Sequence, residues 1–174
     1  SQQGIKILNS AKGTKVGASG KGNTIMSNGS SGIWIYGVDT DTHTIIYNSI
    51  TANGGLGIDL GGVGVGLLDG SNDIMAIPVL TSVTRLTIND HRVIGTATPG
   101  ANVQIFTDPG DASGYGEGRD YLDCVLADGS GNFENTVTIC DKSLKISFTA
   151  TKDGNTSEFS ISSDLPPSYT VINT

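Results

Sequence analysis

NTIMSNGSSGIWI, residues Asn23–Ile35, is followed 25 residues later by NSITANGGLGIDL, residues Asn48–Leu60. The two segments share an Asn, an Ile, an Asn-Gly pair and a final Gly-Ile-x-aliphatic group in the same order. A third copy of that final group, Gly4-Ile5-Lys6-Ile7, lies 28 residues before Gly32–Ile35. A repeat of this length, carried by short strand-like segments, is typical of a β-solenoid.

The aliphatic spacing predicts which side chains face inward. In Gly-Ile-x-Ile the two aliphatic side chains point to one face and the middle residue to the other. We expect three inward stacks, formed by Ile5, Ile33 and Ile58, by Ile7, Ile35 and Leu60, and by Ile25 with Ile50. The middle residues form an outward column of Lys6, Trp34 and Asp59. Further short strands lie around Val16 and Ile45, so residues 1–62 are expected to form about three coils of a right-handed parallel β-helix.

Equivalent turns of the repeat carry Asn28 and Asn53, each followed by Gly. Asn tolerates left-handed backbone geometry and can form hydrogen-bonded ladders between stacked coils. The sequence therefore predicts an Asn ladder on this side of the stack.

The repeat resembles that of bacterial right-handed parallel β-helix surface proteins. The matching stretches are Thr14–Gly17, Gly20–Ile25, Asn28-Gly29, Gly32–Ile35 and Asn53–Gly61, the last similar to that family's closing coil. The resemblance continues into an Ig-like module, through segments such as Asp128–Phe133 and Gly154–Ser160. It implies a non-enzymatic structural or adhesive module in an extracellular, secreted or cell-surface setting.

Residues 63–78 form a Gly-rich junction in which Asp69, Asn72 and Asp73 offer oxygen ligands of the kind that calcium prefers. Their spacing matches no complete calcium loop, so ordinary turn chemistry is favoured over a calcium site.

Residues 79–163 change to a pattern of short strands with turns every 8–12 residues, which predicts an Ig-like antiparallel β-sandwich. The expected strands are Leu80–Leu86, Val93–Ala97, Asn102–Thr107, Tyr121–Leu126, Asn132–Ile139, Leu144–Thr151 and Thr156–Ile161.

The two cysteines, Cys124 and Cys140, permit a disulfide without proving one. A simple hairpin of the fourth and fifth strands would place Cys124 opposite Asn135, about 17 Å from Cys140, too far for a bond. Either the bond is absent, or the fifth strand crosses to the other sheet and bends back.

The chain's 17 acidic and 10 basic residues give a net charge of −7, which disfavours nucleic acid as a partner. No apolar run reaches membrane-spanning length. His43 and His91 are isolated, and Glu117 lies in a Gly-rich loop where solvent exposure is the simpler interpretation. No catalytic residues and no cofactor are expected.

Two surface features remain as candidate sites. Trp34 and Tyr36 lie on the outward face, where aromatic rings can stack on glycans. They keep open the alternative function of a carbohydrate-binding or pectinase-like carbohydrate-processing fragment, although packing against a loop is the simpler interpretation. The first coil, at Gly4, Ile5 and Ile7, carries no recognisable cap, although repeat proteins need one. Residues 164–174 form a tail whose Tyr169, Val171 and Ile172 have strand propensity. We expect self-association through these segments, or contact with the rest of a larger surface protein.

Overall fold

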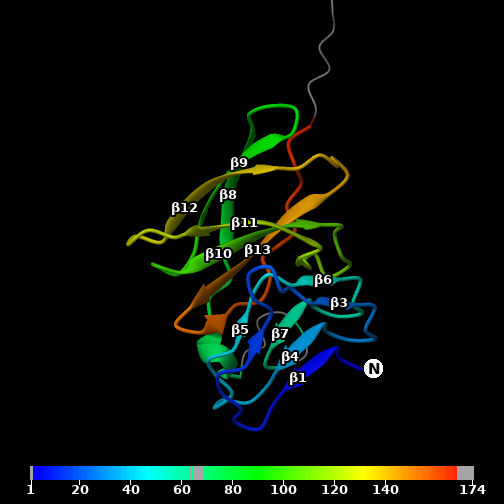
Figure 1. Cartoon of the computed structure of the whole chain (residues 1–174), viewed down its shortest axis with the longest axis vertical. Helices are drawn as coiled ribbons and strands as arrows, with labels where there is room; N and C mark the ends of the chain where they lie inside the picture. The colour runs from blue at the N-terminus through cyan, green and yellow to red at the C-terminus, as the bar shows by residue number, and fades with distance from the viewer. Residues whose placement is uncertain (1, 63, 65–68, 168–174) are drawn as a thin grey trace, which may run out of the picture.

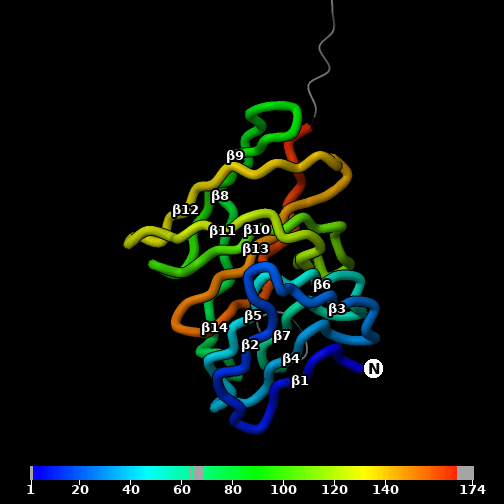
Figure 2. The backbone as a smooth tube through the Cα atoms, viewed as in Figure 1, coloured from blue at the N-terminus to red at the C-terminus, as the bar shows by residue number. Residues whose placement is uncertain are grey.

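The computed structural model describes residues 2–62, 64 and 69–167. This part of the chain is all-β: it contains strands, one short 3-10 helix, η1 (Ser71–Ile74), and no α-helix. Short parallel strands occupy the lower part of the view in Figures 1 and 2, and longer antiparallel strands lie above them. The change of period in the sequence therefore marks a real change of architecture.

Seven short strands make up the first half. They are β1 (Ile5–Ile7), β2 (Lys15–Val16), β3 (Thr24–Met26), β4 (Ile33–Ile35), β5 (Thr44–Ile45), β6 (Ser49–Thr51) and β7 (Ile58–Leu60). They pair in parallel as three sheets, β1-β4-β7, β2-β5 and β3-β6. The chain visits the three sheets in turn, and we call residues 4–31 layer 1 and residues 32–56 layer 2.

The predicted stacks are confirmed by the strand register. Ile5 pairs with Ile33 and Ile33 with Ile58, Ile7–Ile35–Leu60 forms the second stack, and Ile25 pairs with Ile50. Most of these side chains are buried, and Ile33, Ile35 and Leu60 are fully so. The expectation of about three coils needs correction, because β7 is the one strand that the described residues of the third pass add to the parallel sheets.

The second half contains β8 (Val79–Arg85), β9 (Asp90–Thr96), β10 (Asn102–Asp108), β11 (Asp120–Leu126), β12 (Asn132–Thr138), β13 (Lys145–Lys152) and β14 (Asn155–Thr156). Two antiparallel sheets result, with strand orders β11-β10-β13-β14 and β12-β9-β8. Side chains of both sheets share one core that includes Val93, Ile105, Phe133, Ile146 and Phe148.

Six of the seven predicted strands overlap strands of the structure, with ends that differ by a few residues. The seventh, Thr156–Ile161, is predicted too long. The strand β14 ends at Thr156. Beyond it, two serine hydroxyls take the place of backbone carbonyls: Ser157 Oγ accepts from Ala150 N and Ser160 Oγ from Phe148 N, both at 3.0 Å. Side-chain bonding of this kind competes with a regular ladder.

Both cysteines are free thiols in this structure. The strand β12 pairs with β9 in one sheet and β11 with β10 in the other, so these two strands form no hairpin ladder. The fifth strand therefore lies in the other sheet, which is one part of what a disulfide would require, and Cys124 and Cys140 are unbonded.

The two halves share a core instead of being separated by the junction. Phe106 of β10 and Phe159 pack into the aliphatic cluster of the parallel strands. Their rings lie edge to face, with centroids 5.4 Å apart. Such contacts connect the second half directly to the stacked isoleucines.

Candidate functional site

The parallel sheets have two ends, and the second half covers one of them. We call the side of β5, β6 and β7 the covered end and the side of β1, β2 and β3 the open end. A strand at a sheet edge presents unpaired N–H and C=O groups, which is a liability unless something pairs with them. The following contacts show how the covered end is completed.

Six backbone N–H groups at the covered end donate to acceptors of the second half. The pairs are Thr42 with Asn155 Oδ1 (2.6 Å), Ile45 with Thr156 Oγ1 (2.9 Å), Tyr47 with Gln104 Oε1 (3.2 Å), Ile50 with Gly118 O (2.7 Å), Asn53 with Glu117 Oε1 (3.1 Å) and Leu60 with Glu158 Oε1 (3.0 Å). Five of the six acceptors are side-chain oxygens. A further layer of strands would use backbone carbonyls for this purpose, so these side chains act in place of a missing layer.

The predicted Asn ladder exists, and Glu117 forms its last rung. Asn28 donates through its backbone N (3.2 Å) and its Nδ2 (2.8 Å) to Asn53 Oδ1. Asn53 donates in the same way, through N (3.1 Å) and Nδ2 (2.8 Å), to Glu117 Oε1. A carboxylate oxygen thus occupies the position that the next Asn oxygen would take.

The environment of Glu117 is opposite to the solvated loop expected from the sequence. Its side chain is 2% exposed. Burial raises the pKa of Glu117, while the hydrogen bonds from Asn53 act in the lowering direction. Asp108, at the end of β10, is fully buried, and burial likewise raises its pKa against the hydrogen bond from Ser162. These carboxylates serve as hydrogen-bond acceptors within the fold.

A second ladder crosses the sheets at residues 14, 43 and 72. Thr14 N donates to His43 Nδ1 at 3.2 Å, and His43 N donates to Asn72 Oδ1 at 2.8 Å. The separation is 29 residues at each step. Asn72 Nδ2 also donates to Thr156 O at 2.7 Å, so this ladder too ends in the second half. Burial lowers the pKa of His43, although nearby Ala11 and Asp41 act to raise it.

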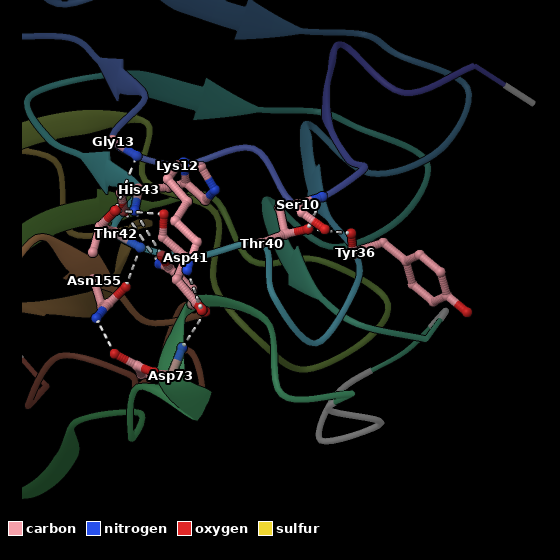
Figure 3. A network of polar contacts seen from close by, with 11 residues as sticks. Ser10, Lys12, Gly13, Tyr36, Thr40, Asp41, Thr42, His43, Asp73 and Asn155 are labelled. Carbon is pink, nitrogen blue, oxygen red and sulfur yellow. Dashed lines mark hydrogen bonds and ion pairs between the residues drawn. The ribbon is translucent and has the colours of Figure 1, made fainter.

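Figure 3 shows how these polar groups connect beside the second ladder. Gly13 N donates to Thr42 Oγ1 at 2.9 Å, and Thr42 N reaches Asn155 Oδ1. The Asn155 amide then donates to Asp73 Oδ2 at 2.7 Å. The network links layer 1, layer 2, η1 and β14 through side chains.

The candidate calcium ligands have protein partners instead of a common centre. Asp69 accepts from Gly37 N and Ser71 N, Asn72 bonds to His43 and Thr156, and Asp73 accepts from Asn155. Within the described ranges, no group of three His, Cys, Asp or Glu side chains is arranged to hold a metal ion. The turn chemistry favoured by the sequence describes Asp69 well.

The aromatic pair lies on the outer face as predicted. Trp34 and Tyr36 have ring centroids 5.3 Å apart, and Tyr36 is 47% exposed. The indole N–H of Trp34 donates to Gly61 O at 2.7 Å, and Lys6 Nζ lies 5.9 Å from the ring centroid. Asp59 was expected to continue this outward column into solvent, but it is 2% exposed and accepts from Ser31 Oγ. Burial raises the pKa of Asp59.

The open end differs from the covered end. Ile7 is buried and Ile5 partly so, while Gly4 N donates to Ser31 O and Ile5 N donates to Gly32 O of layer 2. The side chain of Ile7 therefore points into the stack and Gly4 is exposed, while assembly through Gly4, Ile5 and Ile7 stays a prediction. Tyr169, Val171 and Ile172 of the tail lie outside the described residues.

Neither protein-family models nor curated protein sequences match this chain significantly. No helix in the described residues is long and apolar enough to cross a membrane.

Sequence reasoning missed the residues that complete the covered end, chiefly Gln104, Glu117, Asn155 and Glu158. All four are at most 4% exposed. One signal was available: Asn155–Ser160 is rich in polar residues although it follows the Asp153-Gly154 turn at a place where a strand is expected. A polar run of this kind indicates side chains that have a structural partner.

Proposed function

We propose that the chain is a non-enzymatic extracellular structural module. A short right-handed parallel β-helix is closed at one end by an Ig-like β-sandwich, and together they form the end of a larger surface protein or of a fibre. The observation that carries this proposal is the set of six acceptors on the covered end. They match the spacing of the parallel strands, as an end cap must.

The role of a cap follows from its chemistry. Side-chain acceptors satisfy N–H groups but offer no continuing strand, so the stack stops where they bind. Burying these groups without partners would cost about 1–3 kcal/mol each. Gln104, Glu117, Asn155 and Glu158 are therefore best explained as the parts of the second half that terminate a stack. The open end is where that stack continues, in the same polypeptide or on a neighbouring molecule.

An added layer tests the proposal. A second copy of residues 32–56, placed directly before Gly4, would reproduce the sequence junction between Leu56 and Gly57. We expect the extended protein to unfold in one transition at higher urea than the original. A shuffled version of the same inserted residues is the control. An insert that remains unfolded, with no gain in stability over the control, would contradict a stack that continues at the open end.

Solution behaviour separates this proposal from carbohydrate binding by Trp34 and Tyr36. Fibres seen by electron microscopy, and lost on deletion of residues 168–174, would support self-assembly through the tail. A strict monomer at high concentration, with Trp34 fluorescence changed by polygalacturonate, would favour the carbohydrate function instead. The exposed ring of Tyr36 beside Trp34 is the observation on which that alternative rests.

A further inference from the structure

Charge is distributed unevenly along the chain. Residues 1–38 contain four lysines and no Asp or Glu, a net charge of +4. The remaining residues contain all 17 acidic groups and the other 6 basic groups, a net charge of −11, which together with +4 gives −7. The first segment coincides with layer 1 and the start of layer 2, so the charge difference is also a difference between regions of the fold.

The four lysines surround the open end. Lys6 lies in β1, Lys15 in β2, and Lys12 and Lys21 in the segments on either side of β2. All four side chains are exposed. Lys12 Nζ lies 3.8 Å from Asp41 Oδ2, whereas none of the ion pairs among the described residues involves Lys15 or Lys21.

At the open end, some backbone N–H and C=O groups of β1 and β2 face away from the rest of the stack. Ile5 N donates to Gly32 O, and Ile7 O accepts from Tyr36 N, so Ile5 and Ile7 direct their backbone groups toward β4. Consecutive strand residues direct these groups to opposite sides, and the N–H and C=O of Lys6 therefore face away from β4. By the same reasoning Lys15 faces away from β5, since Thr14 O and Val16 O accept from layer 2. An extended segment can add to such an edge by backbone hydrogen bonding.

A strand that docks here meets the lysines directly. Neighbouring strands lie about 4.8 Å apart, so the residues in register with Lys6 and Lys15 would sit beside two ammonium groups. The identical end of a second copy would bring lysines against lysines, an arrangement that edge strands use to prevent pairing. Within the chain, the layer 2 residue paired with Lys12 is an acid, Asp41.

We propose that the open end is a docking surface for an extended acidic segment of another molecule. Because β1 and β2 belong to separate sheets, such a segment adds along β1 with Asp or Glu in register with Lys6, or along β2 with Asp or Glu in register with Lys15. The lysines select this partner and reject a second copy's open end. The proposal rests on the proposed function, because it specifies what the uncapped end of the stack accepts. The tail sequence Tyr169–Ile172 contains no charged residue, so docking of the tail would be insensitive to salt.

The test uses the full chain and three ten-residue peptides that alternate Thr with Glu, Gln or Lys. We expect only the Glu peptide to bind, with NMR shift changes concentrated in residues 4–26. Raising NaCl from about 0.05 M to about 0.5 M should weaken the binding because salt screens exposed charges. The variant Lys6→Gln/Lys15→Gln, which removes the lysine at either edge, should bind the Glu peptide up to about fivefold more weakly, the effect expected of one exposed ion pair.

The variant Lys145→Gln/Lys152→Gln removes the same charge from the second half and should bind the Glu peptide as the original chain does. Equal binding of the Gln and Glu peptides would show that the lysines do not select an acidic segment, and would overturn the proposal even though an extended peptide binds. Binding that is lost equally in both double variants would show general electrostatic attraction and also overturn the proposal. Failure of all peptides would reject the docking surface, whereas the inserted-layer experiment tests the proposed function separately.

Discussion

Glu117 shows how a single acid can end a repetitive structure. Its oxygen accepts the same two N–H donors from Asn53 that Asn53 accepts from Asn28. An Asn at this point would also present an amide with two donors, which would need a further partner. A carboxylate has only acceptors, and it therefore suits the end of a ladder that donates in one direction.

Replacing Glu117 tests this role. We expect Glu117→Ala to lower the free energy of unfolding by about 1–3 kcal/mol, because the buried donors of Asn53 lose their acceptor. Glu117→Gln keeps an oxygen at the position and should cost less. The measurement is urea unfolding followed by circular dichroism. Glu134→Ala, which removes an exposed partner of Arg92, is the control, and an equal effect of the two Ala variants would contradict the ladder role.

The buried ring of His43 predicts a dependence of stability on pH. Its Nδ1 accepts from Thr14 N, so protonation of that nitrogen would break the ladder. Burial holds the folded-state pKa of His43 below its ordinary value of 6.5. This contribution to stability is fully present above pH 6.5 and is lost as pH falls toward the lower folded pKa, with a slope of at most about 1.4 kcal/mol per pH unit.

The variant His43→Asn isolates this effect, since Asn72 already shows that an Asn oxygen can accept in this ladder. Urea midpoints of the original chain and the variant should be compared between pH 7.5 and pH 5. We expect the original chain to lose more stability than the variant over this range. Parallel curves for the two proteins would contradict the assignment. The difference is informative because the raised pKa values of Asp59, Asp108 and Glu117 affect both proteins alike.

At the scale of elements, the segment that follows β14 determines how the halves join. It runs alongside β13, where Ser157 N donates to Ala150 O and Ser160 N to Phe148 O. Phe159 inserts its ring beside Phe106 into the core of the parallel strands. Gly57 lies against this ring, since a Cβ there would come within 3.0 Å of it. This close approach explains why a residue without a side chain occupies position 57, where the repeat meets Phe159.

Truncation of Phe159 tests the shared core. We expect Phe159→Ala to cost about 3–5 kcal/mol, as is usual for a buried aromatic residue. The first half should be destabilised although the change lies in the second, and fluorescence of Trp34, the only tryptophan, reports on it. Leu126→Ala, which truncates an exposed side chain of the second half, is the control and should leave the Trp34 transition in place. An unchanged Trp34 transition in Phe159→Ala would contradict the shared core.

At the scale of the whole molecule, the two halves should behave as one folding unit. The hydrogen bonds across the covered end and the shared core leave neither half complete alone. We expect Trp34 fluorescence and far-ultraviolet circular dichroism to report coincident transitions in urea, as two-state unfolding requires. Two separated transitions would indicate that the second half folds without the parallel strands.

The sequence by itself determined the periodic parts of this protein. Short-range alternation and the repeat of Ile5, Ile33 and Ile58 predicted the stacks and their register, because side-chain direction in a strand depends only on position along it. The same reasoning located most antiparallel strands and the Asn28–Asn53 ladder.

Only the tertiary structure decided how the stack ends. Gln104, Glu117 and Glu158 come from separate elements, and nothing in their local sequence says that their oxygens meet N–H groups of β5 to β7 from far along the chain. The expectation of a solvated Glu117 was wrong because a polar residue looks alike in sequence whether water or a buried donor satisfies it. Burial and hydrogen-bond partners depend on which segments come together, and that is a property of the folded chain.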